Sequence, residues 1–172
     1  DGDLTLRNIV LATDADQNDL TVTAGGTIRI GRISAGQFYA SEADIPSSAS
    51  GAEAGIFSLS DVTLTAGGAV LQDSADADID LIADHLLIRA EMGVGPLQTS
   101  IQTLDVKTTT GSITIADTDS AGETAPGLRS LTAEAPAGSV TISTGGSVNV
   151  DSVIATGESG IASVFSSSGN LR

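Results

Sequence analysis

Apolar and polar residues alternate along short stretches of this chain, and these stretches recur as a common phrase. The phrase consists of two alternating apolar positions, a Gly-Gly pair and two further apolar positions. It occurs at residues 20–30, 62–72 and 140–150, with Gln72 in place of the last apolar residue of the second copy, and looser versions occur at residues 104–115 and 131–142. A period of two is typical of a β-strand with one buried side, so each copy predicts two strands. Recurrence of the phrase indicates a repeat architecture.

The alternation assigns each side chain of a copy to one of two faces. In the copy at 20–30, the apolar side chains are predicted to point into a core: Leu20, Val22, Ile28 and Ile30. The side chains between them are predicted to face solvent: Thr21, Thr23, Thr27 and Arg29. The glycine pairs at 25–26, 67–68 and 145–146 are expected to supply the positive φ angles of a tight corner.

The spacing of the copies indicates how their strands are arranged. Copies begin at positions 20, 62 and 104, which are 42 residues apart. A strand–Gly-Gly–strand unit is ordinarily a β-hairpin, but recurrence at multiples of roughly 20 residues favours a chain that winds in coils with equivalent strands stacked in parallel. The interval of 42 is then about two coils.

One whole coil is predicted at residues 131–150. Its strands fall near residues 131–133, 140–142 and 148–150, and glycine-containing segments separate them. Three short strands in roughly 20 residues are the layout of a three-sided β-solenoid. We therefore expect an all-β fold of roughly seven to eight coils.

Two segments interrupt the rhythm. Residues 37–55 are rich in Ala, Ser, Gly and acidic residues and contain Pro46, so we expect a loop inserted at a corner. Residues 79–90 have apolar positions at helical spacing, with Asp76 as a candidate N-cap and Gly93 as a stop, which favours a helix when taken alone. The same segment also offers two strand pairs at Ile79/Leu81 and Leu86/Ile88, and within a solenoid we favour these strands.

Composition limits the classes of function. The chain has 172 residues, a net charge of −15, 40% apolar residues, 2% aromatic residues and no cysteine. The charge disfavours binding to nucleic acid or to an anionic membrane, and the missing cysteines exclude thiolate metal sites and disulfides. Since no stretch approaches 18 consecutive apolar residues, the sequence predicts no membrane span. A core poor in aromatic residues suits many thin, similar layers.

Residues 86–115 carry a sharper motif. They contain Gly-Val-Gly, then Pro-Leu-Gln-Thr-Ser, then Thr-Leu and finally Gly-Ser-Ile-Thr-Ile. This order resembles the repeats of large bacterial exoproteins of the filamentous-haemagglutinin type. The resemblance implies a right-handed parallel β-helix in a secreted or surface-attached filament, and it carries over no catalytic residues. On this basis we expect residues 1–172 to be a single β-solenoid segment of a longer repeat protein.

Clusters of aspartates are the first candidates for chemistry. Carboxylates at alternating positions of a strand share one face and are able to hold Ca²⁺. An EF-hand loop starting at Asp76 is excluded, because its sixth and twelfth positions are Leu81 and Leu87. We interpret the clusters as solvated charges, and the question of a calcium site stays open for Asp73, Asp76, Asp78 and Asp80. The other clusters are Asp14, Asp16 and Asp19, and Asp117 with Asp119.

Other side chains give little support for catalysis. His85 is the only histidine and Lys107 the only lysine, so a hydrolase triad or a transition-metal site has few candidates, and we expect His85 to be a solvent-facing turn residue. Thr21 and Thr23, repeated at Thr63 and Thr65, would form an array on one face, for which β-strand propensity is explanation enough. We assign no catalytic, cofactor-binding or metal-binding residue.

The function expected from the sequence is structural. We expect a stalk or filament segment of an extracellular or cell-surface bacterial adhesin-like exoprotein, which presents binding modules or mediates contact between cells. Its expected partners are neighbouring repeats of the same chain, another cell surface or a matrix, and diffusely associated cations. The alternative is a polysaccharide lyase or hydrolase, because many parallel β-helices are such enzymes. That alternative needs a groove of converging charged groups and usually aromatic platforms for sugar rings.

Overall fold

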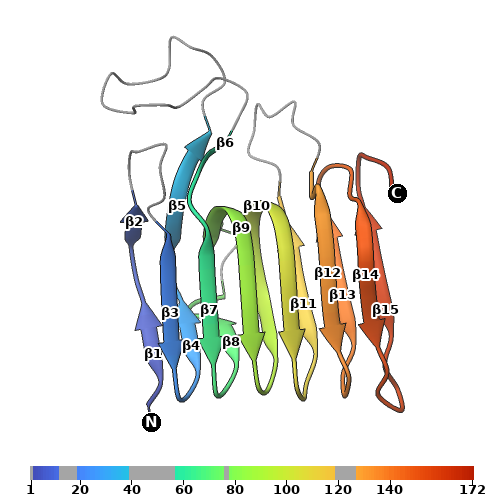
Figure 1. The fold of residues 1–172 in the computed structure, drawn as a ribbon, viewed down its shortest axis with the longest axis horizontal. Coiled ribbons are helices and arrows are strands. Elements are labelled where there is room, and N and C mark those ends of the chain that lie inside the picture. Colours follow the sequence, from blue (N-terminus) through green and yellow to red (C-terminus); the bar gives the residue numbers. More distant parts are fainter. Residues whose placement is uncertain (1, 12–18, 39–56, 76–77, 119–126) are drawn as a thin grey trace.

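The computed structural model describes residues 2–11, 19–38, 57–75, 78–118 and 127–172. Within these residues the chain forms 15 strands in one sheet and no helix, so they contain no helix able to span a membrane. Figure 1 shows the strands standing side by side along the longest axis, from β1 at one end to β14 and β15 at the other. The fold is therefore all-β, as the alternation predicted.

The strands are joined by parallel pairing into three ladders. The first ladder runs along one side of the molecule and contains seven strands: β1 (Leu4–Leu6), β4 (Ile28–Ile30), β8 (Val70–Gln72), the start of β10 (Val94–Thr108), β11 (Ile113–Asp117), β13 (Val140–Thr144) and β15 (Ala162–Ser166). The second ladder contains β3 (Leu20–Ala24), β7 (Val62–Ala66), the end of β9 (Leu81–Ala90), the end of β10, β12 (Ser130–Ala135) and β14 (Val150–Ala155). In Figure 1 its strands point down the page in front of the first ladder, whose strands run upward.

The third ladder is shorter and lies where the chain passes from the first ladder to the second. It contains β2 (Ile9–Leu11), β5 (Ile33–Phe38), the start of β9 and the middle of β10. β5 also pairs with β6 (Phe57–Leu59), and this is the one antiparallel pair among the described strands. The sheet is not closed, because β1 and β15 are each paired on one side only.

The register of the second ladder explains the spacing of the sequence phrase. Leu20 pairs with Val62, Val62 with Leu86, Leu86 with Leu104, and Leu104 with Leu131. The interval from Val62 to Leu104 therefore spans two steps, as predicted. The equal interval from Leu20 to Val62 spans one step only, so the prediction of two coils is wrong there.

The longer step contains the segment that the sequence suggested as an insertion. Gln37 and Phe38, at the start of the predicted loop of 37–55, belong to β5 and pair with β6. The remainder of that loop lies outside the described residues. Because the additional residues lie between two strands that pair with each other, the neighbouring ladders keep their register.

Strand β9 decides between the two interpretations of residues 79–90. It is one continuous strand from Leu81 to Ala90, so the helical alternative is wrong. Ala83 and Leu86 are both fully buried, whereas Asp84 and His85 between them are not. The chain therefore changes the phase of its alternation at Asp84 and His85, and this corner created the apparent helical spacing.

The core is formed by inward side chains stacked in rows from layer to layer. One such row consists of Ile28, Val70, Val94, Ile113 and Val140, each at most 3% exposed. In the last predicted coil, Thr141 is exposed while Val140 and Ile142 are fully buried, so the predicted faces are confirmed there. Val148 is buried, but it forms a single bridge to Leu171 and is not part of a strand. The strand predicted near 148–150 begins only at Val150 and pairs with Leu131, so the prediction of three strands in one coil at 131–150 is wrong.

The glycine pairs have a different role from the predicted one. Among the described glycines, Gly95 and Gly111 have positive φ, and those at 25–26, 67–68 and 145–146 do not. Instead, successive corners lie close together. A Cβ on Gly67 would overlap the carbonyl oxygen of Gly25 in the layer before it, and a Cβ on Gly68 would lie 2.9 Å from the carbonyl carbon of Gly26. These glycines are required by close packing between layers and not by a left-handed turn.

Candidate functional site

A shallow groove of about 350 Å³ lies on the outer face of the second ladder, and charged side chains are among the residues that line it. Register places Arg89 beside Lys107, and Lys107 beside Glu134, in three successive layers. Arg89 donates to both carboxylate oxygens of Asp105, at 3.1 and 2.7 Å, and Lys107 Nζ lies 2.8 Å from Glu134 Oε2. The groove is lined by Thr65, Ala66, Gly67, Arg89, Ala90, Glu91, Lys107 and Thr109.

These charges are engaged with one another. The guanidinium of Arg89 also donates to the backbone carbonyls of Ile88 at 3.0 Å and of Asp105 at 3.2 Å, so four acceptor atoms surround it. Each ion pair joins one layer to the next across partly exposed side chains, which makes its contribution to stability modest. The arrangement ties neighbouring layers of the second ladder together.

The described aspartates of the candidate calcium site make separate contacts. Asp73 accepts a hydrogen bond from Arg7 Nε at 2.8 Å, and this bond raises the pKa of Arg7. Asp80 is 2% exposed, and its Oδ2 accepts from the backbone N–H of Gln98 at 2.8 Å. Asp78 is exposed, and Asp76 lies outside the described residues.

The remaining acidic clusters fall partly outside the described residues, which exclude Asp14, Asp16 and Asp119. Asp19 accepts from the backbone N–H of Asp61 at 3.0 Å. In the part of the chain that the structure describes, no three His, Asp or Glu side chains come together as metal ligands would. The question of a calcium site therefore stays open only for a set that includes residues beyond this part.

Asp117 is buried, contrary to its interpretation as a solvated charge. It is 3% exposed, and its Oδ1 accepts from Thr99 Oγ1 at 3.2 Å and from the backbone N–H of Ile101 at 3.1 Å. Its Oδ2 lies 3.4 Å from the hydroxyl of Thr144, in the layer that follows. Asp117 thus anchors the corner between the first and third ladders. Its burial was predictable from the alternation of faces along β11, because Asp117 follows the inward-facing Ile113 and Ile115 at the same two-residue spacing.

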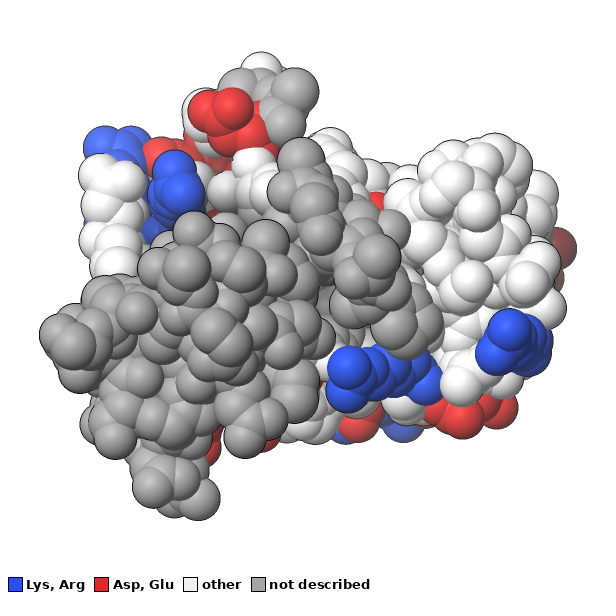
Figure 2. Space-filling view, turned by 90° about the horizontal axis from the view of Figure 1, so that it is seen from above, with Lys and Arg blue, Asp and Glu red and all other residues white. Residues whose placement is uncertain are grey.

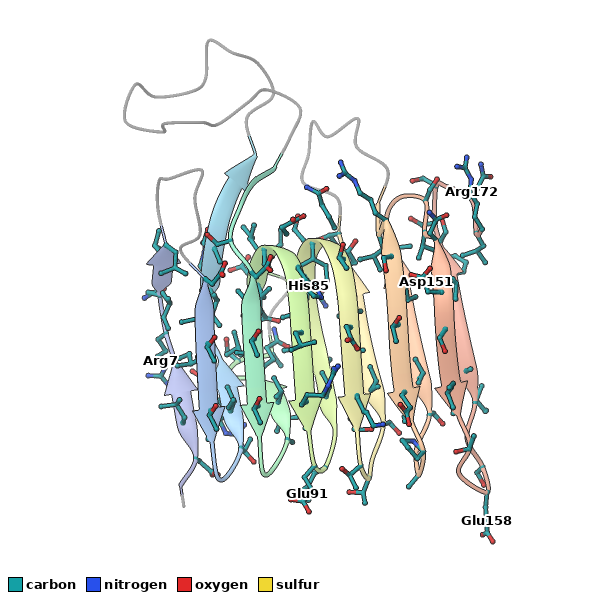
Figure 3. All side chains as sticks on the ribbon, in the orientation of Figure 1. Arg7, His85, Glu91, Asp151, Glu158 and Arg172 are labelled. Atoms are coloured by element: carbon teal, nitrogen blue, oxygen red, sulfur yellow. The ribbon has the colours of Figure 1, made fainter. Side chains whose placement is uncertain are left out.

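His85 lies in β9 at a corner of the second ladder and not in a turn (Figure 3). Its Nδ1 is 3.8 Å from Asp61 Oδ2, and both side chains are partly exposed. Burial raises the pKa of the neighbouring Asp84, the charge of Asp61 raises it further, and Arg129 and His85 oppose the shift. The acidic partners make His85 part of a small charged cluster, which is considered below.

The predicted threonine array exists but is short. Thr21 pairs with Thr63 in register, and Thr23 with Thr65. In the following layer these two rows continue with Leu87 and Arg89. A flat array that matches a long repetitive ligand would have to extend further.

Basic side chains do not form a continuous surface on the face seen from above. Figure 2 shows the Lys and Arg side chains of this face as separate groups among neutral and acidic residues. A hollow of about 120 Å³ lies between Arg129 and Arg172 near one end and is also lined by Leu128, Ser147, Val148 and Asn149. Neither arginine forms an ion pair within the described part of the chain.

Comparison of the chain with protein-family models, with curated proteins and with solved structures gives no match.

Proposed function

We propose that residues 1–172 are a segment of a right-handed, three-sided parallel β-solenoid of seven to eight layers, and that the segment serves as a structural stalk or filament. The larger protein would be a bacterial adhesin-like exoprotein, secreted or attached to the cell surface. The observation that carries the proposal is the unbroken parallel pairing of the first ladder from β1 to β15.

The three ladders support a three-sided coil. Up to β10, the chain visits the first, third and second ladders in turn and then returns to the first, one strand further along. From β11 to β15, the described strands alternate between the first and second ladders. Seven strands in the first ladder correspond to seven layers, and strand spacing of about 4.8 Å gives about 29 Å between the first and the last strand. Because each layer contacts only its neighbours, the length of such a structure grows with the number of layers.

Side-chain contacts between layers support a structural role. The pairs Arg89–Asp105 and Lys107–Glu134 join adjacent layers of the second ladder on its outer face. Inside, the buried carboxylate of Asp117 joins the layers of Thr99 and Thr144. Polar groups that bind the next layer, outside and inside, stabilise a stack more directly than they would serve a substrate.

The proposal is tested in the cell that makes the protein. The segment is deleted in one strain, and in a second strain it is replaced by an unrelated β-solenoid with the same number of layers. If the segment is a spacer, the replacement restores surface presentation and cell contact, whereas the deletion does not. Loss of cell contact in both strains, despite normal surface presentation, would contradict a purely structural role.

The polysaccharide-active alternative is tested on the purified chain. Anionic and neutral polysaccharides are incubated with it, and new reducing ends or unsaturated products are measured. A stalk gives no turnover. Turnover that is lost in Arg89→Gln but kept in the control Arg29→Gln would contradict the stalk and would place the activity in the groove of the second ladder.

A further inference from the structure

Four polar residues occupy the same corner of the chain in successive layers. We call them the corner row: Ser60, Asp84, Gln102 and Arg129. The backbone N–H of Asp84 donates to the carbonyl of Ser60 at 3.2 Å, and that of Arg129 donates to the carbonyl of Gln102 at 2.7 Å. Asp84 and Gln102 lie opposite each other in neighbouring layers. The residues on either side of them are paired in register, Ala83 with Ile101 and His85 with Thr103.

Gln102 is the anomaly of this row. Its side chain is 4% exposed, and its Oε1 is buried with no hydrogen-bond partner. A buried acceptor without a donor is destabilising, and native proteins rarely contain one. The neighbouring members of the row that carry a donor are Arg129 and, when its carboxyl is neutral, Asp84.

Asp84 is placed to be that donor. In-register neighbours of a parallel ladder lie about 4.8 Å apart and project to the same side, which brings a carboxyl and an amide within reach of each other. An ionised carboxylate accepts hydrogen bonds only, whereas a neutral carboxyl also donates one. The environment favours the neutral form, because burial and the charge of Asp61 both disfavour a second negative charge.

The charges facing Asp84 in the described residues come from three directions. Asp61, at the start of the neighbouring layer, favours the neutral carboxyl. His85 on the same strand and Arg129 at the end of the corner row favour the ionised form. Nδ1 of His85 lies 3.8 Å from Oδ2 of Asp61, so the histidine faces both carboxyl groups.

We propose that the corner row binds a proton between Asp84 and Gln102, with the neutral carboxyl of Asp84 donating a hydrogen bond to Oε1 of Gln102. The proton is taken from solvent onto one carboxylate oxygen, and no other bond changes. The inference stands independently of the proposed stalk function.

The consequence is that the protonated Asp84 contributes to the stability of the stack in mild acid. Since the folded chain holds this proton more tightly than the unfolded chain, whose Asp has a pKa of about 3.9, the stabilisation is complete below about pH 3.9. It is lost as the pH rises through the higher pKa of the folded state. Other carboxyl groups of the chain titrate in the same pH range, so the contribution of Asp84 must be isolated by substitution.

The experiment uses Asp84→Asn, whose side-chain NH₂ donates a hydrogen bond at every pH. Melting temperatures are measured from pH 3.5 to 8 for the wild type, Asp84→Asn, Gln102→Met and the double variant. Glu158→Gln is the control, because it removes the same charge from an exposed side chain at the lower turn (Figure 3). The ¹³C chemical shift of the Asp84 carboxyl is titrated in the wild type.

The proposal predicts that Asp84→Asn raises the melting temperature at pH 8, by about 2–4 °C, and raises it little at pH 3.5. The gain at pH 8 shrinks when Gln102 is Met, and Glu158→Gln does not reproduce it. The Asp84 carboxyl titrates above about 3.9 in the wild type. If Asp84→Asn raises the melting temperature equally with Gln and with Met at position 102, the gain comes from relief of charge repulsion alone. That result would overturn the proposal. A wild-type titration midpoint at or below about 3.9 would also overturn it, and that measurement needs no variant to fold.

Discussion

The inward and outward faces of β13 lead to the sharpest test of the packing. Ile142 is fully buried and stacks between Ile115 of the preceding layer and Val164 of the following one. Thr141, its neighbour in sequence, is exposed between Thr114 and Ser163. Ile142→Asp and Thr141→Asp introduce the same charge one residue apart, so their effects differ only through the face on which each side chain lies.

The magnitudes follow from burial. Ile142→Asp forfeits about 1.5–3 kcal/mol of apolar burial. It also places a carboxyl among aliphatic side chains without a partner, which costs at least a further 1–3 kcal/mol or so. A total of about 3–6 kcal/mol is a large part of the 5–15 kcal/mol that typically holds a domain together. Thr141→Asp leaves the core intact and is expected to cost less than about 1 kcal/mol.

The assay is urea unfolding followed by circular dichroism at pH 7. Ile142→Ala is included, because it isolates the loss of packing, at about 2–5 kcal/mol, from the buried charge. The expected order of destabilisation is Ile142→Asp, then Ile142→Ala, then Thr141→Asp. Equal effects of the two aspartates would refute the assignment of faces.

Three further outcomes are expected. Gly67→Ala should destabilise the chain by about 1–3 kcal/mol in urea unfolding, because its Cβ overlaps backbone of the preceding layer, whereas Gly2→Ala meets nothing within 4 Å and should be neutral. Asp117→Ala should lower stability by about 2–4 kcal/mol and Asp117→Asn by less, since the amide keeps one acceptor; equal losses would contradict the hydrogen-bond account. Ca²⁺ should raise the melting temperature gradually, and NaCl should reproduce the rise by screening the net charge of −15. A saturable response to micromolar Ca²⁺ that NaCl does not mimic would instead indicate a site near Asp73 and Asp80.

Much of the fold was predictable because the alternation of side chains between the two faces of a strand depends only on neighbouring residues in the sequence. The alternation of Val140, Thr141 and Ile142 alone shows which side is buried, and the structure agrees. Parallel stacking was predictable from recurrence, because equivalent strands of a repeat occupy equivalent positions. The number of residues between paired strands was not predictable. Residues between β5 and β6 lengthen one such interval to 42 residues, and Leu20 still pairs with Val62.

The corners between the ladders were harder to predict from the sequence. Asp84 and His85 interrupt the alternation of β9, and a phase change of this kind imitates helical spacing when a sequence is read without its neighbours in space. The roles of Gly67 and Gly68 were also hidden, because the atoms that exclude a side chain there belong to residues 25 and 26 of another layer. Contacts between layers depend on register, which a single copy of the phrase does not contain.

The polar sites were predictable only in part. Parity places Asp117 inside, beside Ile113 and Ile115, although its cluster in the sequence suggested a solvated charge. The ion pair of Asp73 with Arg7 joins residues that are 66 positions apart in the sequence, and no local sequence pattern predicts it. The unsatisfied amide of Gln102 becomes visible only when its burial and its neighbours in adjacent layers are known.

Parallel stacking of each strand on the equivalent strand of the next layer underlies the whole fold. It is tested by nuclear Overhauser effects between backbone amide and Hα protons of the uniformly labelled chain. The account predicts parallel cross-strand contacts joining residues 20–24 to 62–66, and 62–66 to 86–90, with none joining 20–24 to 28–30. Antiparallel contacts between 20–24 and 28–30 would show a β-hairpin at the first Gly-Gly corner and would contradict the account.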